Sequence, residues 1–592
     1  MKIKNIKYVA AAMLLGLSVT SCSDFLDRPV EDNYNTENFY TDDASCIKGV
    51  NYLYNSPWYD FQRAFIKIGE VMSGNMYWGS SPYMNFSLNG TDQDLVNMSY
   101  SLWAEIGHAN TVYNSIKGSG ASESVKNQCM GECLAWKAMA YFYLVRTFGD
   151  VPIVHDNSTH IGSGDYNELH KVEKADVYEY ILMTLEKAME LLPKQKSTTG
   201  RIDYYCAEGL YAKVLLTAAG VTGSLNQEYL TKASAASLDV IENSGRQLMP
   251  NYEDIFRGSN NVSDESLIAW RWTVGAQWTS QNTLQSDLMP DGFDENGDCW
   301  GGWGGPSADL QDAFGYDVTD NPATRVETDV RRKATMMGPG DIYEYFWRDH
   351  DLGNNKKGLD ILKFYYDKEY NTAASGQFQG PCGVQNVKHA YGDNADHLAE
   401  MGSSAGRMAY ALATHILRLS DVYLVHAEAE VLLGHTTSQT ALDAFNAVRG
   451  RAVASAVPKT SLTFADIWKE RRLEFAGEGD RWYDFVRRAY YDVNSCIAEL
   501  KAQRRNAIWG CDGVYKNYFE SGGSSWQPEG VWDQTNQKYT IDPIKYDDET
   551  PAPNVTANSF VLPYPTEDVA LNPNLGSGVA PDHVDVREAY SY

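Results

Sequence analysis

Glycines flank two tryptophans in the segment Asp298-Cys-Trp300-Gly-Gly-Trp303-Gly-Gly, and this arrangement suits one kind of chemistry. A pyranose ring has an apolar face of C–H groups that can lie on an aromatic ring, while polar side chains bond to its hydroxyls. A loop presents such rings to solvent while the scaffold beneath it fixes their position. We therefore predict that Trp300 and Trp303, with Asp298 beside them, contact a glycan. The alternative is that both tryptophans pack the loop itself, because large aromatic side chains are usually mostly buried.

A second turn-rich loop has a similar composition. It reads Gly74-Asn75-Met-Tyr77-Trp78-Gly79 and is followed by Tyr83. We predict glycan contacts for Asn75, Tyr77, Trp78 and Tyr83 on the same reasoning. Loop packing is again the alternative.

The remaining tryptophans carry weaker patterns. Trp270 and Trp272 alternate with Ile268 on a predicted strand, which favours a core face. The sequence assigns neither role to Trp278 or Trp347.

Acidic residues just before Trp300 resemble the first half of a calcium-binding loop. Asp294, Asn296 and Asp298 have the required spacing, but Cys299 stands where the turn glycine belongs and Gly305 where the bidentate glutamate belongs. We interpret the segment as a polar turn and predict neither a metal nor another cofactor, keeping these three residues only as weak metal candidates.

The cysteines also predict no metal site. Eight follow Cys22, and none forms a Cys-x-x-Cys pair: Cys46, Cys129, Cys133, Cys206, Cys299, Cys382, Cys496 and Cys511. Most are expected to be buried thiols, and any disulfide connectivity stays open.

The densest charge cluster, between Glu470 and Asp484, admits two interpretations. Paired carboxylates and arginines could do acid–base chemistry. Structural ion-pair networks have the same composition, and Gly477 and Gly479 indicate a corner that such a network would pin. We favour the network and predict no catalytic residue.

Helical patterns must position these loops. An apolar run from 416 to 433 predicts a helix covered on at least two faces, with Arg418, Asp421 and Glu428 on one polar stripe. Further helices are expected around 442–448 and from Thr463, which lies three residues before Asp466 as in a weakened capping box. Earlier helices are predicted at 102–116, 123–148, 173–192, 204–219 and 229–241. Repeated helices joined by short loops favour stacked helical hairpins of tetratricopeptide type.

The N-terminus predicts export and lipidation. Lys2, Lys4 and Lys7 precede an apolar run too short to span a bilayer, as in a signal peptide. The run ends in Val-Thr-Ser-Cys22, which resembles a bacterial lipoprotein processing box, with ordinary cleavage as the alternative. Several acyl chains on Cys22 would anchor the protein firmly. The net charge of −28 argues against nucleic acid and anionic lipid as partners.

Several sequence blocks together resemble the SusD/RagB family. They are the lipoprotein start followed by SCSDFLD, and then GECLAWKAMAYFYLVRTFGDVPIV, TGRIDYYCAEGLYAKVLL, RLSDVYLVHAEAEVLL, AFNAVRGRA, ERRLEFAGEGDRWYDFVR and LPYPTEDVALNPNLG. The resemblance implies a mainly α fold, in which a tetratricopeptide-like scaffold carries a loop-rich, partly β ligand-binding region. It also implies a surface lipoprotein of the outer membrane that captures oligosaccharide or polysaccharide for a SusC-like TonB-dependent transporter.

With this resemblance the chain divides into six segments. They are a signal peptide (1–21), a lipidated flexible tether (22–42), an N-terminal helical region (43–250), a loop-rich aromatic ligand-binding region (251–405), C-terminal tetratricopeptide-like helices (406–490) and a loop-rich closing segment (491–592).

The expected function is therefore non-enzymatic glycan capture, and two other functions stay open. One is binding of peptides or another nutrient, since a scaffold does not fix its ligand. The other is a glycoside hydrolase using two of Asp291, Asp294 and Asp298, which the resemblance disfavours. The identity, linkage and length of the glycan are open at this point.

Overall fold

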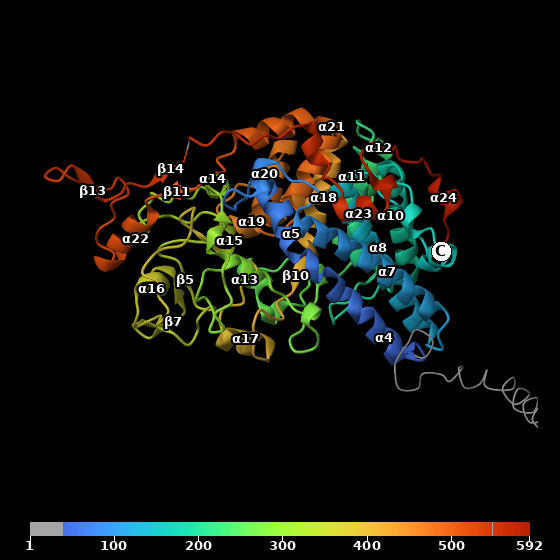
Figure 1. Ribbon diagram of the computed structural model, residues 1–592, viewed down its shortest axis with the longest axis horizontal. Helices are drawn as coiled ribbons and strands as arrows, with labels where there is room; N and C mark the ends of the chain where they lie inside the picture. Colours follow the sequence, from blue (N-terminus) through green and yellow to red (C-terminus); the bar gives the residue numbers. More distant parts are fainter. Residues whose placement is uncertain (1–38, 548) are drawn as a thin grey trace, which may run out of the picture.

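A computed structural model describes residues 39–547 and 549–592 (Figure 1). The signal peptide, Cys22 and most of the 22–42 tether lie outside the described residues. Half of the chain is helical and 8% is strand, which confirms the mainly α prediction. No helix in the described part is both long enough and apolar enough to cross a membrane.

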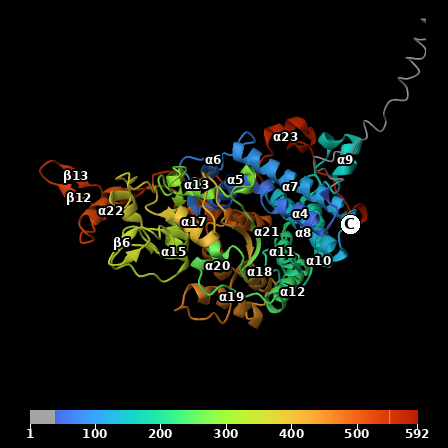
Figure 2. The ribbon, with the colours of Figure 1, turned by 90° about the horizontal axis from the view of Figure 1, so that it is seen from below.

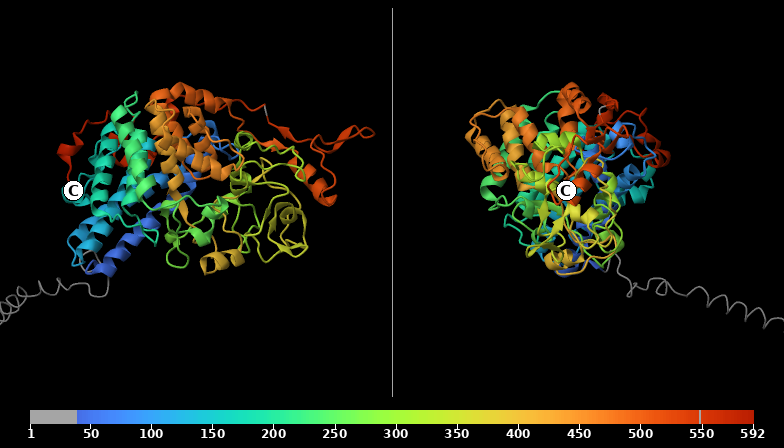
Figure 3. Two further views of the ribbon diagram at one scale, coloured as in Figure 1. Left: turned by 180° about the vertical axis from the view of Figure 1, so that it is seen from behind. Right: turned by 90° about the vertical axis from the view of Figure 1, so that its left-hand side faces the viewer.

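Long helices form one continuous stack. Each packs on the next in the order α7–α8–α10–α11–α12–α18, and α18 also contacts α19 and α20. Figure 3 shows the orange helices near the C-terminus directly beside the green helices of the N-terminal region. The helices concerned are α4 (Asp43–Asn51), α7 (Gln93–Lys117), α8 (Glu123–Phe148), α10 (Lys174–Leu191), α11 (Tyr204–Ala218), α12 (Gln227–Asn243), α18 (Leu419–Leu432), α19 (Gln439–Ala452), α20 (Phe464–Phe475) and α21 (Arg481–Ala502).

The helix ends follow local sequence signals. Asp203 and Asn226 accept hydrogen bonds from the first turns of α11 and α12. Thr463 and Asp466 form the predicted capping box at the start of α20. Such caps satisfy backbone N–H groups that have no partner within the helix.

Two helix predictions were wrong at their start. The helix expected at 102–116 begins earlier, at Gln93 of α7, and the helix expected at 416–433 begins later. Residues Thr414–Arg418 form the strand β10, and α18 begins only at Leu419. β10 pairs antiparallel with β2 (Ser266–Trp270), whose residues are all buried. The first residues of the apolar run therefore form a strand, because they pair with a strand far away in the sequence. The predicted polar stripe is therefore wrong for Arg418, which lies on the strand. Asp421 and Glu428 do lie on α18 and contact buried arginines: Asp421 Oδ1 lies 2.7 Å from Arg471 Nη1, and Glu428 pairs with Arg487.

Short elements and loops form a region beside the helical stack, at the lower left of Figure 1. The helices here and near the C-terminus are α13 (Leu284–Leu288), α14 (Ala308–Phe314), α15 (Arg331–Thr335), α16 (Ile361–Tyr366), α17 (Asn394–Met401), α22 (Cys511–Glu520), α23 (Thr566–Leu571) and α24 (Val586–Ala589). The two-stranded pairs are β1 (Met76–Tyr77) with β3 (Gly305–Pro306), β4 (Met336–Met337) with β9 (Gln385–Asn386), β5 (Ile342–Tyr343) with β8 (Leu359–Asp360), β6 (Asp351–Gly353) with β7 (Lys356–Lys357) and β11 (Ile508–Trp509) with β14 (Lys545–Tyr546).

A hairpin of β12 (Val531–Asp533) and β13 (Lys538–Ile541) extends from one end of the molecule (Figures 1 and 2). The chain then returns toward the N-terminal helices, where α24 contacts α10.

The charge cluster is a buried ion-pair network, as predicted. Arg418 contacts Glu265 at 2.6 Å, Glu474 at 3.0 Å and Glu478 at 2.7 Å, and all four residues are buried. Neighbouring arginines lower the pKa of Glu474 against the opposing effect of burial. The network joins β10 to the corner after α20.

The cysteines and two of the tryptophans are core residues. All eight cysteines in the described residues are buried and unpaired. Trp270 and Trp272 are buried, which confirms their predicted core role. Trp347 is also buried and its Nε1 donates to Phe293 O at 3.1 Å, whereas Trp278 is 58% exposed.

Candidate ligand-binding site

A cavity of about 590 Å³ opens between the predicted tryptophan loop and a loop around residue 378. Trp303 is 75% exposed and Trp300 41% exposed, while Phe378 is buried. The lining residues are Asp291, Gly297, Cys299, Trp300, Gly302, Trp303, Gln377, Phe378 and Gln379. Aromatic rings and amide groups therefore dominate its wall.

The helix α13 holds Trp300 in place. The backbone N–H of Trp300 donates to Ser286 O at 2.9 Å, and its indole Nε1 donates to Asp287 Oδ1, also at 2.9 Å. Burial raises the pKa of Asp287. Because both ends of the tryptophan are bonded, its ring has one fixed orientation beside the cavity.

The glycines of this loop serve close packing as well as exposure. A Cβ added at Gly301 would lie 2.3 Å from Asp287 O, and one at Gly302 would lie 3.0 Å from the Gln379 side-chain oxygen. A side chain at Gly301 would push the loop off α13, and one at Gly302 would displace the Gln379 side chain. Trp303 follows in the short 3₁₀ helix η8 (Gly301–Trp303) and extends outward.

The second predicted loop lies against the first. In the β1–β3 pair, Met76 is opposite Pro306 and Tyr77 is opposite Gly305. A Cβ at Gly304 would lie 2.6 Å from the Trp78 ring, so Trp78 packs directly on the loop that carries Trp303. Tyr77 and Trp78 are half-buried. The two predicted loops, more than 200 residues apart in the sequence, thus pack against each other.

Two residues predicted in that loop face the interior, and this corrects their predicted glycan contacts. Asn75 Nδ2 donates to Glu70 Oε2 at 2.9 Å, and its Oδ1 accepts from Arg472 Nε at 2.8 Å. The Tyr83 hydroxyl donates to Asp92 Oδ1 at 2.6 Å. Both side chains are about 1% exposed, which leaves no surface for a sugar.

Asp298 is also buried, beneath the cavity rather than on its wall. It accepts from Met408 N, and its Oδ1 has no hydrogen-bond partner among the described residues. Burial and the nearby Asp294 carboxylate raise the pKa of Asp298 to about 6. Direct glycan contact by Asp298 therefore does not fit its position.

The weak metal candidates come together only in part. Asp294, Asp298 and the Cys299 thiol have possible ligand atoms within 4.8 Å of one another, all in buried residues. Asn296 is exposed and its backbone N–H donates to Asp294 Oδ1 at 3.1 Å, as in the predicted polar turn. Calcium takes six to eight oxygen ligands, and this arrangement of two carboxylates and a thiol does not fit it.

Sequence reasoning missed the opposite wall of the cavity. Gln377, Phe378 and Gln379 lie between Gly376 and Gly380, a glycine-flanked aromatic pattern like that around Trp300. The same pattern could therefore have indicated them.

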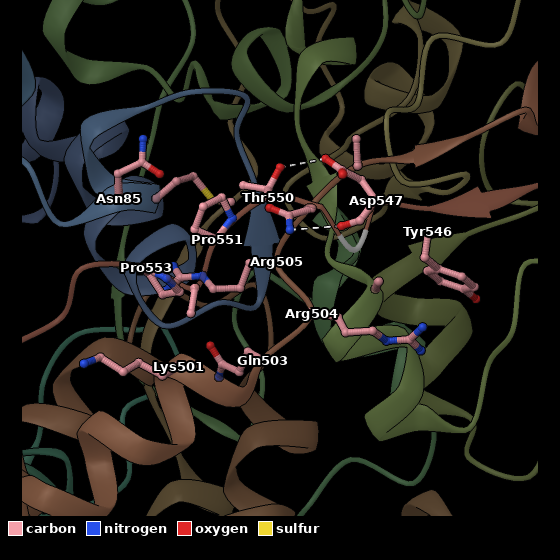
Figure 4. Close-up of a pocket in the computed structure, with 15 residues that line it drawn as sticks. Asn85, Lys501, Gln503, Arg504, Arg505, Tyr546, Asp547, Thr550, Pro551 and Pro553 are labelled. Carbon is pink, nitrogen blue, oxygen red and sulfur yellow. Dashed lines mark hydrogen bonds between the residues drawn. The ribbon is translucent and has the colours of Figure 1, made fainter.

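A second pocket, of about 180 Å³, differs in chemistry (Figure 4). Lys501, Gln503, Arg504 and Arg505 meet Tyr546, Asp547 and residues 550–553 there. The figure shows Arg504 extending toward Tyr546, and its guanidinium carbon lies 4.1 Å from the centre of that ring. Arg504 also donates to Asp312 Oδ1 at 2.6 Å. Tyr546 is the one aromatic residue among those that line this pocket, and the arginine covers one face of its ring.

Comparison with known proteins adds two family matches and several relatives. Residues 239–577 match the model described as "SusD family", and residues 24–216 match one described as "Starch-binding associating with outer membrane". A SusD-like protein of Bacteroides ovatus is 32% identical, with 98% of each chain covered.

Solved structures have the same fold. One crystal structure with a xylogluco-oligosaccharide is 28% identical, with a TM-score of 0.73 and coverage of 91% of this chain and 100% of that one. A SusD-like carbohydrate-binding protein from Bacteroides fragilis is 19% identical, with a TM-score of 0.64 and coverage of 91% and 100%.

Proposed function

The chain belongs to the SusD/RagB family, and we propose that it is a non-catalytic protein that captures neutral oligosaccharides and polysaccharides in the cavity beside Trp300 and Trp303. One observation carries the proposal: the fixed Trp300 and the more exposed Trp303 line a cavity whose opposite wall carries two amide side chains. The rings suit the C–H faces of sugars, and the amides of Gln377 and Gln379 can both donate to and accept from hydroxyls.

Neutral sugars suit the charges around the cavity. Asp291 is the one charged residue among those that line it, and the whole chain has a net charge of −28. An anionic sugar would therefore meet repulsion, with no compensating cation among the residues that line the cavity. The relative bound to a xylogluco-oligosaccharide supports a neutral glucan as the first ligand to test.

A binding role is better supported than hydrolysis. Glycoside hydrolases use two carboxylates on either side of the scissile bond, about 5 to 9.5 Å apart. Only Asp291 reaches the cavity wall, because Asp294 and Asp298 are buried below it. Incubation with xyloglucan should therefore release no new reducing ends, and their steady release would contradict the proposal.

Affinity gels test binding directly. The chain from residue 23 onward, which includes every residue that the structure describes, would be run in native gels. The gels would contain xyloglucan, laminarin, starch, arabinoxylan or anionic polygalacturonate. At least one neutral polysaccharide should retard the wild-type protein, and a Trp300→Ala/Trp303→Ala variant should migrate freely.

Trp532→Ala is the matched control, since Trp532 is 42% exposed on the projecting β12–β13 hairpin. Retardation that persists in the double variant would move the site elsewhere. Failure of every polysaccharide, together with binding of a peptide mixture, would favour the peptide alternative.

The proposal also includes a location and a partner. We place the protein at the outer-membrane surface, anchored through acylated Cys22, where it passes glycans to a SusC-like TonB-dependent transporter. The family description that mentions the outer membrane supports this location. Replacing Cys22 by serine should release the protein from membranes, and the wild-type protein should copurify with a co-expressed transporter of that type.

A further inference from the structure

A helical segment behind the cavity connects several tryptophans of the surface. The elements η2 (Ser56–Phe61), α5 (Gln62–Ile66) and η3 (Lys67–Met72) follow one another without interruption. Tyr59, Arg63 and Lys67 come one from each of these three elements.

Each of these three side chains approaches a different tryptophan, either directly or through one intervening residue. The Tyr59 and Trp278 rings meet edge to face, with centroids 6.4 Å apart. Arg63 Nε lies 3.4 Å from Asp287 Oδ2, and Asp287 Oδ1 accepts from the Trp300 indole.

At the far end of the segment, Lys67 Nζ lies 6.0 Å from the centre of the Trp78 ring. Trp78 in turn packs on Gly304, next to Trp303. The segment therefore supports the cavity at one end and Trp278 at the other.

Trp278 is exposed although its loop is held in place. Its side chain is 58% exposed, more than that of Trp300. At the base of the loop, Thr273 N donates to Ser280 O at 2.7 Å and Ser280 Oγ donates to Gln277 O at 2.8 Å. An exposed large aromatic on an ordered loop is what a preformed binding surface needs, because little flexibility is lost when a ligand binds.

Arg63 provides polar groups between Trp278 and Trp300. Its side chain is 53% exposed, and a guanidinium carries five N–H donors that can reach sugar hydroxyls. The Trp278 ring, the N–H donors of Arg63 and the Trp300 ring thus follow one another toward the cavity.

We propose that the glycan-contacting surface continues from the cavity across Arg63 to Trp278, so that the protein binds an extended run of neutral sugar units rather than a single terminal sugar. The inference rests on the proposed function. It adds a subsite that a short oligosaccharide in the cavity would leave empty.

Ligands of graded length separate this subsite from the cavity. The probes are the panel polysaccharide that retards the wild-type protein, beginning with xyloglucan, and oligosaccharides cut from it. Calorimetry would measure their binding to the wild-type protein and to Trp278→Ala, Trp278→Phe and Trp532→Ala.

We expect Trp278→Ala to weaken binding of the longest chains about tenfold and that of the shortest bound oligosaccharide less than twofold. Trp278→Phe keeps an aromatic ring and should recover most of the loss. The exposed control Trp532→Ala should match the wild-type protein at every length.

The outcomes are distinguishable. If Trp278→Ala leaves every affinity unchanged, or weakens short and long ligands equally, the subsite is refuted while glycan capture stands. If no polysaccharide binds the wild-type protein, both the subsite and the proposed function are refuted.

Discussion

Replacing Glu105 by glutamine should remove a pH dependence from the stability of the helical stack. Glu105 lies fully buried on α7, and neither carboxyl oxygen has a hydrogen-bond partner among the residues that the structure describes. Burial raises the pKa of this carboxyl well above its ordinary value, because an unpartnered charge is far more costly in the interior than in water. The folded protein therefore holds Glu105 protonated where the unfolded chain ionises it.

The size of this pH dependence follows from the single proton that Glu105 binds in the folded protein and releases in the unfolded chain. A carboxyl whose pKa rises on folding contributes its full stability below the unfolded pKa, near 4.5, and loses it as the pH rises toward the folded pKa. Between these values the free energy of unfolding falls by about 1.4 kcal/mol per pH unit. From pH 5.5 to 7.0 the wild-type protein should lose stability relative to Glu105→Gln, by up to about 2 kcal/mol.

Urea unfolding followed by tryptophan fluorescence at both pH values provides the assay. Comparison with Glu105→Gln cancels the contributions of all other titrating groups. An exposed control, Glu520→Gln, should keep the wild-type pH dependence. Parallel pH curves for the wild-type protein and Glu105→Gln would refute the reasoning, since Glu105 would then have the same charge in both states.

Three further changes test the site and the scaffold. Gly301→Ala should weaken glycan retardation in native gels at least as much as loss of one tryptophan, because its Cβ would meet the Asp287 carbonyl at 2.3 Å; Gly162→Ala, in open space, should have no effect. Arg418→Met should lower the free energy of unfolding by about 3–5 kcal/mol in urea, since it removes the cation shared by three buried glutamates and leaves each with fewer partners, and a loss under 1 kcal/mol would contradict this. Thr463→Ala should cost about 1 kcal/mol through the lost cap of α20 without changing glycan affinity.

Local signals predicted a helix well where the chain itself marks its end. The helix predicted at 123–148 has those bounds in the structure, and the turn at Gly149 stops it. The apolar run at 416–418 has no such marker, and periodicity alone does not separate a short buried strand from a helix. Its state depends on β2, about 150 residues earlier in the chain.

The site was predictable only as far as local composition determines exposure. Flanking glycines correctly indicated that Trp300 and Trp303 have open faces. The inward orientation of Asn75 and Tyr83 depends on Arg472 and Asp92, which approach them only in the folded chain. The pairing of β1 with β3, which brings the two loops together, is likewise a tertiary contact.

The buried thiols give the protein built-in reporters of local opening. Cys129 and Cys133 lie in the helical core, whereas Cys299 and Cys382 lie in the core of the loop-rich region. A thiol reagent in the medium would label each cysteine only as fast as its surroundings open. Mass spectrometry of the labelled peptides would then rank the opening of the two cores. Since Cys299 also lines the cavity, a captured glycan would appear as slower labelling at that one position.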